Sequence, residues 1–259
     1  MRNIALRLSY DGSRYHGWQL QRSELTVAGA LETALSAVCG PGRRVTGCGR
    51  TDAGVHALVY CANFSTDSKI PAHRLPYALN SRLPPDIAVS AALDVPVDFD
   101  AVVSCIKKEY TYEIYCSRLP DPFRVNRAYR YPLKPDVGAM RSAAAAFVGT
   151  LDFAAMRSAG SRTKTTVRTV FRYDIDCDGD TIRLRVCADG FLYNMARAMA
   201  GTLLYVSEGK ISPDGVPALL ASGDRRLAGP TVPARGLYMT GLWYDGPAGD
   251  MFTDRPSLR

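Results

Sequence analysis

One short stretch of the chain places a single carboxylate among glycines, with a cation two positions before it. Residues 47 to 57 read Gly-Cys-Gly-Arg-Thr-Asp-Ala-Gly-Val-His-Ala and contain Arg50 and Asp52. The glycines permit backbone angles closed to other residues and let a bulky ligand approach the main chain closely. An ionised carboxylate in such a turn could act as a nucleophile or a base. A hairpin turn whose aspartate caps its own backbone has the same composition, so this stretch alone leaves both interpretations open.

Two other chemistries are disfavoured by the residues around this turn. A dinucleotide-binding turn needs a helix directly after its glycines, whereas a strand pattern follows Gly54. A second carboxylate for glycosidase chemistry is missing near Asp52 in the sequence, although pairing with a distant residue stays open. We therefore expect no nucleotide cofactor.

The charge of the chain favours a polyanionic partner. The formal net charge is +7, from 32 Lys and Arg against 25 Asp and Glu. Two stretches, 123–134 and 157–173, carry cations and no acid; the cations are Arg124, Arg127, Arg130, Lys134, Arg157, Arg162, Lys164, Arg168 and Arg172. Tyr129 and Tyr131 alternate with arginines, which predicts stacking surfaces for bases beside phosphate contacts. Solvated surfaces have similar patterns, so charge alone does not decide RNA binding.

Cysteine and histidine usage predicts a protein of a reducing compartment without a metal site. The cysteines lie at 39, 48, 61, 105, 116, 177 and 187, an odd number without Cys-x-x-Cys spacing, which does not suit a disulfide framework. His16, His56 and His73 are too scattered to suggest a zinc site. We see no signal peptide and no apolar stretch long enough to cross a membrane. We expect a cytoplasmic protein.

The first part of the chain has the pattern strand, helix, strands, helix, strand. Alternating apolar residues predict a strand over 4–10, which ends at Asp11-Gly12. Thr26 is the candidate N-cap of a helix over 27–38, which Gly40 stops. The other elements expected here are strands at 58–64 and 87–93 and a short helix at 71–79.

A similar plan recurs after Phe99. Asp178-Gly179 predicts a hairpin between two strands. The elements expected here are strands at 110–114, 167–177, 181–188 and 237–244 and helices at 137–148 and 191–206. With 259 residues, 47% of them hydrophobic, the chain can form one large domain or two smaller ones. We predict two similar α+β halves, an N-terminal half 1–105 that carries Asp52 and a C-terminal half 106–245, followed by a flexible tail 246–259.

Several blocks of residues, taken in order, resemble one known family. The most specific block is Gly49-Arg50-Thr51-Asp52-Ala53-Gly54-Val55-His56-Ala57. The others are Tyr10-Asp11-Gly12, Tyr15-x-Gly17-Trp18-Gln19, Ala78-Leu79-Asn80-Ser81 with Leu83-Pro84, Lys108-Glu109-Tyr110-x-Tyr112, Gly190-Phe191-Leu192 through Met195 to Arg197, Gly201-Thr202, and Pro233-Ala234 with Gly236-Leu237-Tyr238. Together they span nearly the whole chain and resemble the tRNA pseudouridine synthases of the A type, which convert uridines 38 to 40 of the anticodon stem-loop.

The resemblance implies a fold and a set of partners. It implies the pseudouridine synthase fold, with mainly antiparallel sheets flanked by helices and a catalytic cleft between the halves. It implies a homodimer that acts on the tRNA anticodon stem-loop without metal or organic cofactor. The main alternatives are a non-catalytic RNA-binding module and a synthase that acts on other tRNA positions.

The resemblance also implies roles for individual residues. Asp52 is expected to be the catalytic nucleophile or base, with Tyr110 against the target base and Arg197 paired with the aspartate. Arg50 and Thr51 are expected to bind the substrate together with Tyr110 and Arg197. From its position, we expect Arg50 to fill the space left by the flipped nucleotide or to hold that nucleotide's phosphate. Whether Asp52 attacks C1′ of the ribose or removes a ribose proton stays open.

Three positions depart from the family pattern. Val102 follows Phe99-Asp100-Ala101 where the family usually has an arginine, Leu151 replaces a usual histidine, and Ala198 stands where asparagine is frequent. Asp52, Tyr110 and Arg197 are not affected. We expect these departures to alter tRNA affinity and choice of position more than the type of reaction.

Overall fold

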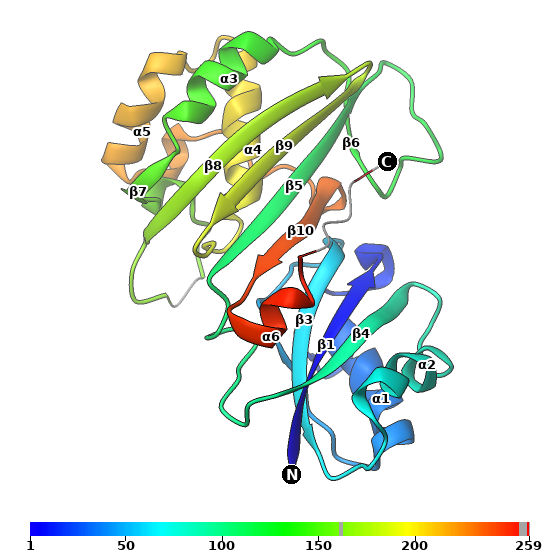
Figure 1. Cartoon of the computed structure of the whole chain (residues 1–259). Coiled ribbons are helices and arrows are strands. Elements are labelled where there is room, and N and C mark those ends of the chain that lie inside the picture. The colour runs from blue at the N-terminus through cyan, green and yellow to red at the C-terminus, as the bar shows by residue number, and fades with distance from the viewer. Residues whose placement is uncertain (161–162, 254–257, 259) are drawn as a thin grey trace. The chain divides into compact units, whose positions relative to one another are not determined.

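The chain folds into two compact units. The computed structural model describes residues 1–160, 163–253 and 258. Unit 1 comprises Met1–Lys108 and Tyr238–Arg259, and unit 2 comprises Glu109–Leu237. Each unit contains a sheet with helices packed against it, as Figure 1 shows. The predicted α+β fold class is therefore confirmed.

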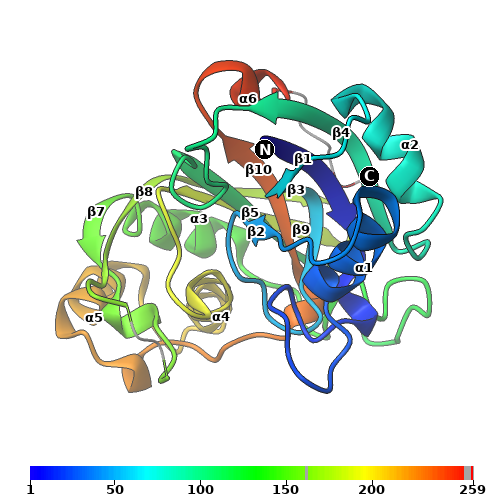
Figure 2. The ribbon, with the colours of Figure 1, turned by 90° about the horizontal axis from the view of Figure 1, so that it is seen from below.

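Unit 1 is built on a mainly antiparallel sheet with the order β4-β1-β3-β10 and with β2 paired to β3. Its strands are β1 (Arg2–Tyr10), β2 (Thr46–Gly47), β3 (His56–Thr66), β4 (Ile87–Val95) and β10 (Leu237–Trp243). Its helices are α1 (Val27–Cys39), α2 (Leu75–Asn80) and α6 (Gly246–Asp250). Helices α1 and α2 lie next to each other beside the sheet (Figures 1 and 2). Strand β3 pairs antiparallel with β1 and parallel with β10.

The first strand and helix form where the sequence predicts them. Strand β1 ends at Tyr10, directly before Asp11 and Gly12. The hydroxyl of Thr26 accepts a hydrogen bond from the Gly29 amide over 3.2 Å, which satisfies one of the donors left open at the start of α1. The apolar face of α1 is fully buried at Leu31 and Leu35. This face packs α1 on the core of unit 1.

Unit 2 contains the sheet order β5-β9-β8-β7, with β6 paired parallel to β5. The strands are β5 (Lys107–Cys116), β6 (Tyr129–Tyr131), β7 (Gly149–Asp152), β8 (Val167–Asp178) and β9 (Thr181–Ala188). The helices are α3 (Val137–Ala145), α4 (Met195–Ser207) and α5 (Val216–Ser222), which lie on the same face of this sheet (Figures 1 and 2). The predicted hairpin between β8 and β9 is confirmed, and Gly179 takes a φ of +59° in it.

Two helices of unit 2 differ from their predicted spans. Helix α3 ends at Ala145 instead of 148, and Gly149, with a φ of +125°, begins the unpredicted strand β7. Helix α4 begins at Met195 instead of 191. Asn194 has a φ of +63°, a left-handed conformation that a right-handed helix cannot include. Apolar periodicity does not reveal such a break.

The structure also differs from the expected limits of the halves. Strand β10 was expected in the C-terminal half, but Tyr238 and Met239 pair with His56 and Ala57 of β3 in unit 1. Within the predicted tail, α6 covers Gly246–Asp250 and Phe252 is only 4% exposed. Local sequence patterns do not report pairing between strands this far apart in the chain. No helix in the described part of the chain is long and apolar enough to span a membrane.

Candidate active site

The Asp52 turn joins β2 to β3 in unit 1. The Val55 amide donates to the Asp52 carbonyl over 3.1 Å, and Gly54 has a φ of +79°, so the chain turns sharply before β3. Thr51 is buried, Asp52 is half-buried and Arg50 is exposed. Three neighbouring side chains therefore have different surroundings. The carboxylate lies at the border between core and solvent, where a ligand could reach it.

Hydrogen bonds hold the backbone before Asp52 at three of its carbonyls. The Cys48 carbonyl accepts from Nζ of Lys108, the Gly49 carbonyl from the Tyr60 hydroxyl, and the Thr51 carbonyl from the Trp18 amide at 3.2 Å. The Thr51 hydroxyl also lies 3.0 Å from the buried Tyr10 hydroxyl. A turn with this many fixed points keeps its carboxylate in one place, which preorganisation of a catalytic group requires.

The segment between β1 and α1 supports the turn through close packing. A Cβ at Gly17, which has a φ of +81°, would lie 2.1 Å from the Thr51 carbonyl oxygen. A Cβ at Gly12 would lie 1.9 Å from the Val55 carbonyl oxygen. These two glycines let the segment lie directly against both ends of the turn. Their spacing in the sequence does not reveal this role, although both fall in the blocks that carry the resemblance.

Buried aromatic side chains complete this support. The ring centroids of Trp18 and Tyr60 are 4.3 Å apart, and a Cβ at Gly47 would meet both side chains at about 2.4–2.5 Å. At Gly47 the groups that approach the main chain closely are therefore side chains of the protein itself, and close approach of a ligand to this turn stays a prediction. Burial raises the pKa of Tyr10 well above its usual range, so its hydroxyl keeps its proton.

His56 anchors the end of the turn at the start of β3. Its side chain is 2% exposed, and Nδ1 accepts from the Gly12 amide over 3.0 Å. Its ring stacks on Tyr238 with centroids 4.6 Å apart, and Nδ1 lies 3.2 Å from an Asp11 carboxylate oxygen. The His56 side chain thus joins the turn to β10 and to the Asp11-Gly12 segment. Among the described residues, no three His, Cys, Asp or Glu side chains are grouped as a metal site requires.

Lys108 supplies the charged contact to this turn. Its Nζ donates to the Cys48 carbonyl, and its charge opposes the burial that raises the pKa of the Cys48 thiol to about 12. We expect Lys108→Met to reduce turnover about tenfold or more, because small displacements of reacting groups have large kinetic effects. Steady-state kinetics and thermal unfolding would measure this, and Lys108→Arg should retain most of the activity.

Lys107→Met is the matched control for this prediction. Lys107 precedes Lys108 in β5, and its Nζ lies 4.8 Å from the centre of the Trp243 ring. The same chemical change one residue away should therefore affect turnover little. Equal kinetics for the two methionine variants would show that Lys108 does not position the turn.

Tyr110 lies on β5 in unit 2 and is 8% exposed. Its ring meets the edge of Phe191 with centroids 4.9 Å apart, close to perpendicular. The preceding residue, Glu109, points to the other face of the strand and forms an ion pair with Arg172 while 5% exposed. Phe191 thus contacts the Tyr110 ring from one side, while the Glu109 ion pair lies on the other face of β5.

Arg197 is the third residue of α4, and its side chain is half-buried. Its Nε donates to the Val232 carbonyl and its Nη1 to Oδ1 of Asn194, both over 2.7 Å. Burial raises the pKa of Tyr112 well above its usual range, and the positive charge of Arg197 opposes this effect. Arg197 is therefore not an arginine on an exposed helix face.

Comparison with known proteins identifies the relatives of this chain. A protein named tRNA pseudouridine synthase A from Caldicellulosiruptor bescii is 44% identical over 244 residues, which are 94% of this chain and 100% of that protein. A protein of the same name from Bacillus subtilis is 42% identical over 240 residues, which are 92% and 97% of the two chains. A family model described as tRNA pseudouridine synthase matches residues 8–102 and 143–245. The chain belongs to this family.

Family membership confirms the resemblance and the enzyme class, an isomerase of the tRNA pseudouridine synthase family. The ranges that the family model matches include Arg50, Thr51, Asp52 and Arg197 but not Tyr110. In the structure, Arg50, Thr51 and Asp52 lie in unit 1, whereas Tyr110 and Arg197 lie in unit 2. Their shared action on one nucleotide stays a prediction.

One of the two tyrosines expected to stack on bases, Tyr131, is buried. Tyr131 is 6% exposed and its hydroxyl donates to Glu208, while Tyr129 is half-buried between Tyr112 and Tyr131. That expectation is wrong for Tyr131, because the short strand β6 turns its side chain into unit 2. Phe123 is instead the exposed aromatic side chain of the same basic stretch, at 88%. Arg162 of the second basic stretch lies outside the described residues.

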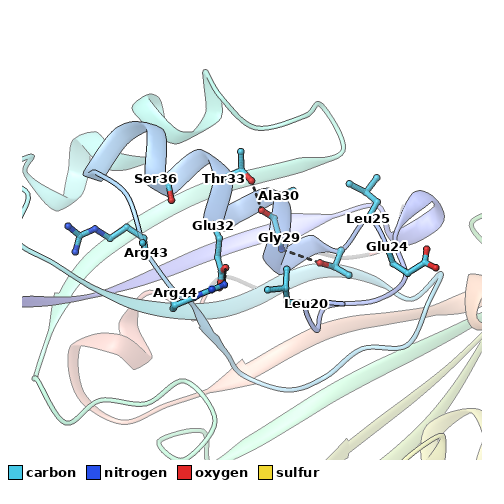
Figure 3. Close-up of a pocket in the computed structure, with 12 residues that line it drawn as sticks. Leu20, Glu24, Leu25, Gly29, Ala30, Glu32, Thr33, Ser36, Arg43 and Arg44 are labelled. Atoms are coloured by element: carbon cyan, nitrogen blue, oxygen red, sulfur yellow. Dashed lines mark hydrogen bonds and ion pairs between the residues drawn. The ribbon is translucent and has the colours of Figure 1, made fainter. Parts of the chain in front are cut away.

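A groove on unit 1 lies away from the residues expected to act. Its volume is about 600 Å³, and Figure 3 shows it along α1, where Glu32 forms an ion pair with Arg44 over 2.7 Å. Leu20 and Leu25 also line it. Arg50, Thr51 and Asp52 are not among the lining residues. Nothing in its composition points to a nucleoside.

The departures from the family pattern have different surroundings. Val102 is 46% exposed. The arginine that the family usually has at this position would therefore lie on the surface. Leu151 is half-buried in β7. Ala198 is fully buried in α4, and its carbonyl accepts from the Thr202 hydroxyl over 2.8 Å. None of these positions is a neighbour of Asp52 in the turn.

Proposed function

We propose that this chain isomerises uridine to pseudouridine at positions 38, 39 and 40 in the anticodon stem-loop of tRNA. The observation that carries the proposal is a family match over nearly the whole chain that includes a turn holding Asp52 by its backbone. Isomerisation breaks the N1–C1′ bond, turns the uracil, forms a C5–C1′ bond and removes the proton from C5, while the released N1 takes up a proton. These steps balance without an outside oxidant or reductant.

Asp52 is the proposed catalytic group, and its chemistry requires the ionised carboxylate. One route has the carboxylate attack C1′ as the uracil leaves, and the other has it remove a ribose proton to give a glycal. Both routes need a carboxylate in a fixed position, which the hydrogen bonds around Cys48, Gly49 and Thr51 support. Arg197 is proposed to pair with Asp52, because a guanidinium favours the anion and fixes its direction.

Tyr110 is proposed to stack on the target base. Its phenol has a reference pKa of about 10, which makes it a poor base at neutral pH. The perpendicular contact with Phe191 holds the ring from one side and supports a stacking role. Help with removal of the C5 proton is a secondary part of this proposal. Thr51, held by the Tyr10 hydroxyl, is proposed to bind the substrate next to Asp52.

Arg50 is proposed to fill the space left by the flipped nucleotide or to hold its phosphate. Its side chain is exposed, and hydrogen bonds to the carbonyls of its neighbours Gly49 and Thr51 hold the backbone on both sides of it. Extracting a paired nucleotide costs a few kcal/mol. We expect Arg50→Ala to lower turnover or tRNA affinity about tenfold, measured separately by single-turnover kinetics and by equilibrium binding.

Arg22→Ala is the control, because it removes the same charge from another exposed site in unit 1. If Arg50→Ala and Arg22→Ala leave both quantities at the wild-type values, Arg50 has no role in flipping.

The oligomeric state and the cellular compartment are also part of the proposal. We infer a homodimer in the cytoplasm that binds tRNA through its basic stretches, with no metal or organic cofactor. No disulfide joins cysteines in the described part of the chain, which supports a reducing compartment. Light scattering of the purified protein, alone and with tRNA, would measure the number of copies.

The decisive experiment uses unmodified tRNA labelled with tritium at uridine C5. Wild-type protein should release the label as C5 loses its proton, and mapping the product should give positions 38, 39 and 40. A non-catalytic RNA-binding module would bind this tRNA without releasing tritium. Release from other positions would support the alternative of a synthase with a different site preference.

A further inference from the structure

Asn194 combines an unusual backbone with an unusual use of its side chain. Its φ is +63° and its ψ is 7°. Among the described residues 1–160 and 163–253, Asn194 is the only non-glycine residue with a positive φ. Left-handed conformations of non-glycine residues are uncommon, and they gather at functional sites. Asparagine tolerates this conformation better than most residues.

The side chain of Asn194 does not cap the helix that it precedes. Asn194 is the N-cap of α4, and asparagine is among the best capping residues, yet its side chain makes no capping hydrogen bond. Its carbonyl accepts from the Ala198 amide over 2.9 Å, so the helix begins in the ordinary way. The amide group of the side chain therefore serves something other than the helix end.

That amide group lies between Arg197 and Ser158. Oδ1 accepts from Nη1 of Arg197 over 2.7 Å, and Nδ2 donates to the Ser158 hydroxyl over 2.9 Å. A guanidinium can only donate, so the amide oxygen faces Arg197, and the Ser158 hydroxyl accepts from the amide nitrogen on the other side. Nε of Arg197 donates to the Val232 carbonyl, so contacts at two different nitrogens fix the plane of the guanidinium.

We propose that Asn194 is a positioning residue that sets the direction of the Arg197 guanidinium. Residues at i and i+3 of a helix lie on one face, and the left-handed backbone brings the Asn194 amide back over that face. The inference rests on the proposed function, in which Arg197 directs the catalytic carboxylate. It adds a residue that touches neither the carboxylate nor the base in that proposal.

Substituting Asn194 by glycine or by alanine separates the effect of the left-handed backbone from the effect of the side-chain amide. Asn194→Gly suits the left-handed conformation and removes the amide, whereas Asn194→Ala removes the amide and strains the backbone. We expect both variants to lower kcat about tenfold or more with little change in KM. Only the alanine variant should unfold at a clearly lower temperature. Wild-type kcat in Asn194→Gly would overturn the proposal, because the residue would then serve only the backbone.

Asn194→Asp tests whether a side-chain acceptor at position 194 restores turnover. Asn194→Asp tolerates the left-handed backbone and keeps an acceptor for Arg197, and the Ser158 hydroxyl can turn to donate to it. Turnover should exceed that of Asn194→Gly, and turnover no higher than that of the glycine variant would contradict the inference. Asp214→Gly, at an exposed site in unit 2 outside both basic stretches, is the control for a substitution to glycine and should leave kinetics unchanged.

A second measurement reads the guanidinium without using activity. Nitrogen NMR of the Arg197 side chain, assigned with Arg197→Lys, reports how fast the guanidinium rotates. Rotation should be faster in Asn194→Gly than in the wild type, and unchanged rotation would refute the positioning role. If the wild type releases no tritium from tRNA, the proposed function fails, while the rotation measurement still decides what Asn194 does.

Discussion

Replacing Asp52 by asparagine is expected to reduce tritium release from labelled tRNA by about a thousandfold or more. Asparagine keeps the shape of the side chain and removes the charge, so it can neither attack C1′ nor take a ribose proton. The backbone contacts of the turn do not depend on the carboxylate, because they involve the carbonyls of Cys48, Gly49 and Thr51. The free energy of unfolding should therefore change by less than about 1 kcal/mol.

Asp98→Asn is the matched control for this loss. Asp98 is exposed and lies between β4 and β5, so the same change there should leave both turnover and stability as they are. Binding of tRNA to Asp52→Asn, measured at the same salt concentration as for the wild type, should persist. Release of tritium by Asp52→Asn at the wild-type rate would refute the assignment of Asp52.

Gly17→Ala is expected to lower the free energy of unfolding by about 2–4 kcal/mol and to abolish most of the turnover. Gly17 has a φ of +81°, and an added Cβ would lie 2.1 Å from the Thr51 carbonyl oxygen. The neighbouring Trp18 amide donates to that same oxygen, so the clash and the hydrogen bond act on one peptide group. Moving this group moves Asp52, which follows it directly. Chemical denaturation and tritium release would measure the two effects.

Gly42→Ala is the control that separates the cost of the left-handed backbone from the cost of the steric clash at Gly17. Gly42 has a similar φ of +76°, but a Cβ there would meet no atom within 4 Å. This variant should lose about 1 kcal/mol of stability from the left-handed conformation and keep its turnover. If the two alanine variants lose equal amounts of stability, contact between Gly17 and Thr51 does not support the turn.

Local sequence signals sufficed for the early elements of the chain. The alternation that ends at Tyr10, the cap at Thr26 and the hairpin at Gly179 are short-range features, and the structure confirms each of them. Such features depend on residues within a few positions of one another. The same holds for the turn around Asp52, whose glycines and single acid were sufficient to mark it as a candidate site.

The start of α4 and the burial of Tyr131 could not be predicted from such short-range features. The apolar stripe of α4 extends back to Phe191, and only the left-handed Asn194 stops the helix. Tyr131 has the same sequence surroundings as an exposed tyrosine, and its burial follows from the pairing of β6 with β5. Periodicity records which residues are apolar and does not record which surface later covers them.

By itself, the sequence determined the fold class, the family and the residue to which the chemistry is assigned, because motif blocks and apolar spacing are properties of the chain alone. Tertiary structure decided what supports that residue. The contacts of the Asp52 turn come from Trp18, Tyr60 and Lys108, which lie far from one another in the sequence. The assignment of β10 to unit 1 likewise depends on its pairing with β3. Such contacts form only when distant segments pack together, so no local pattern can report them.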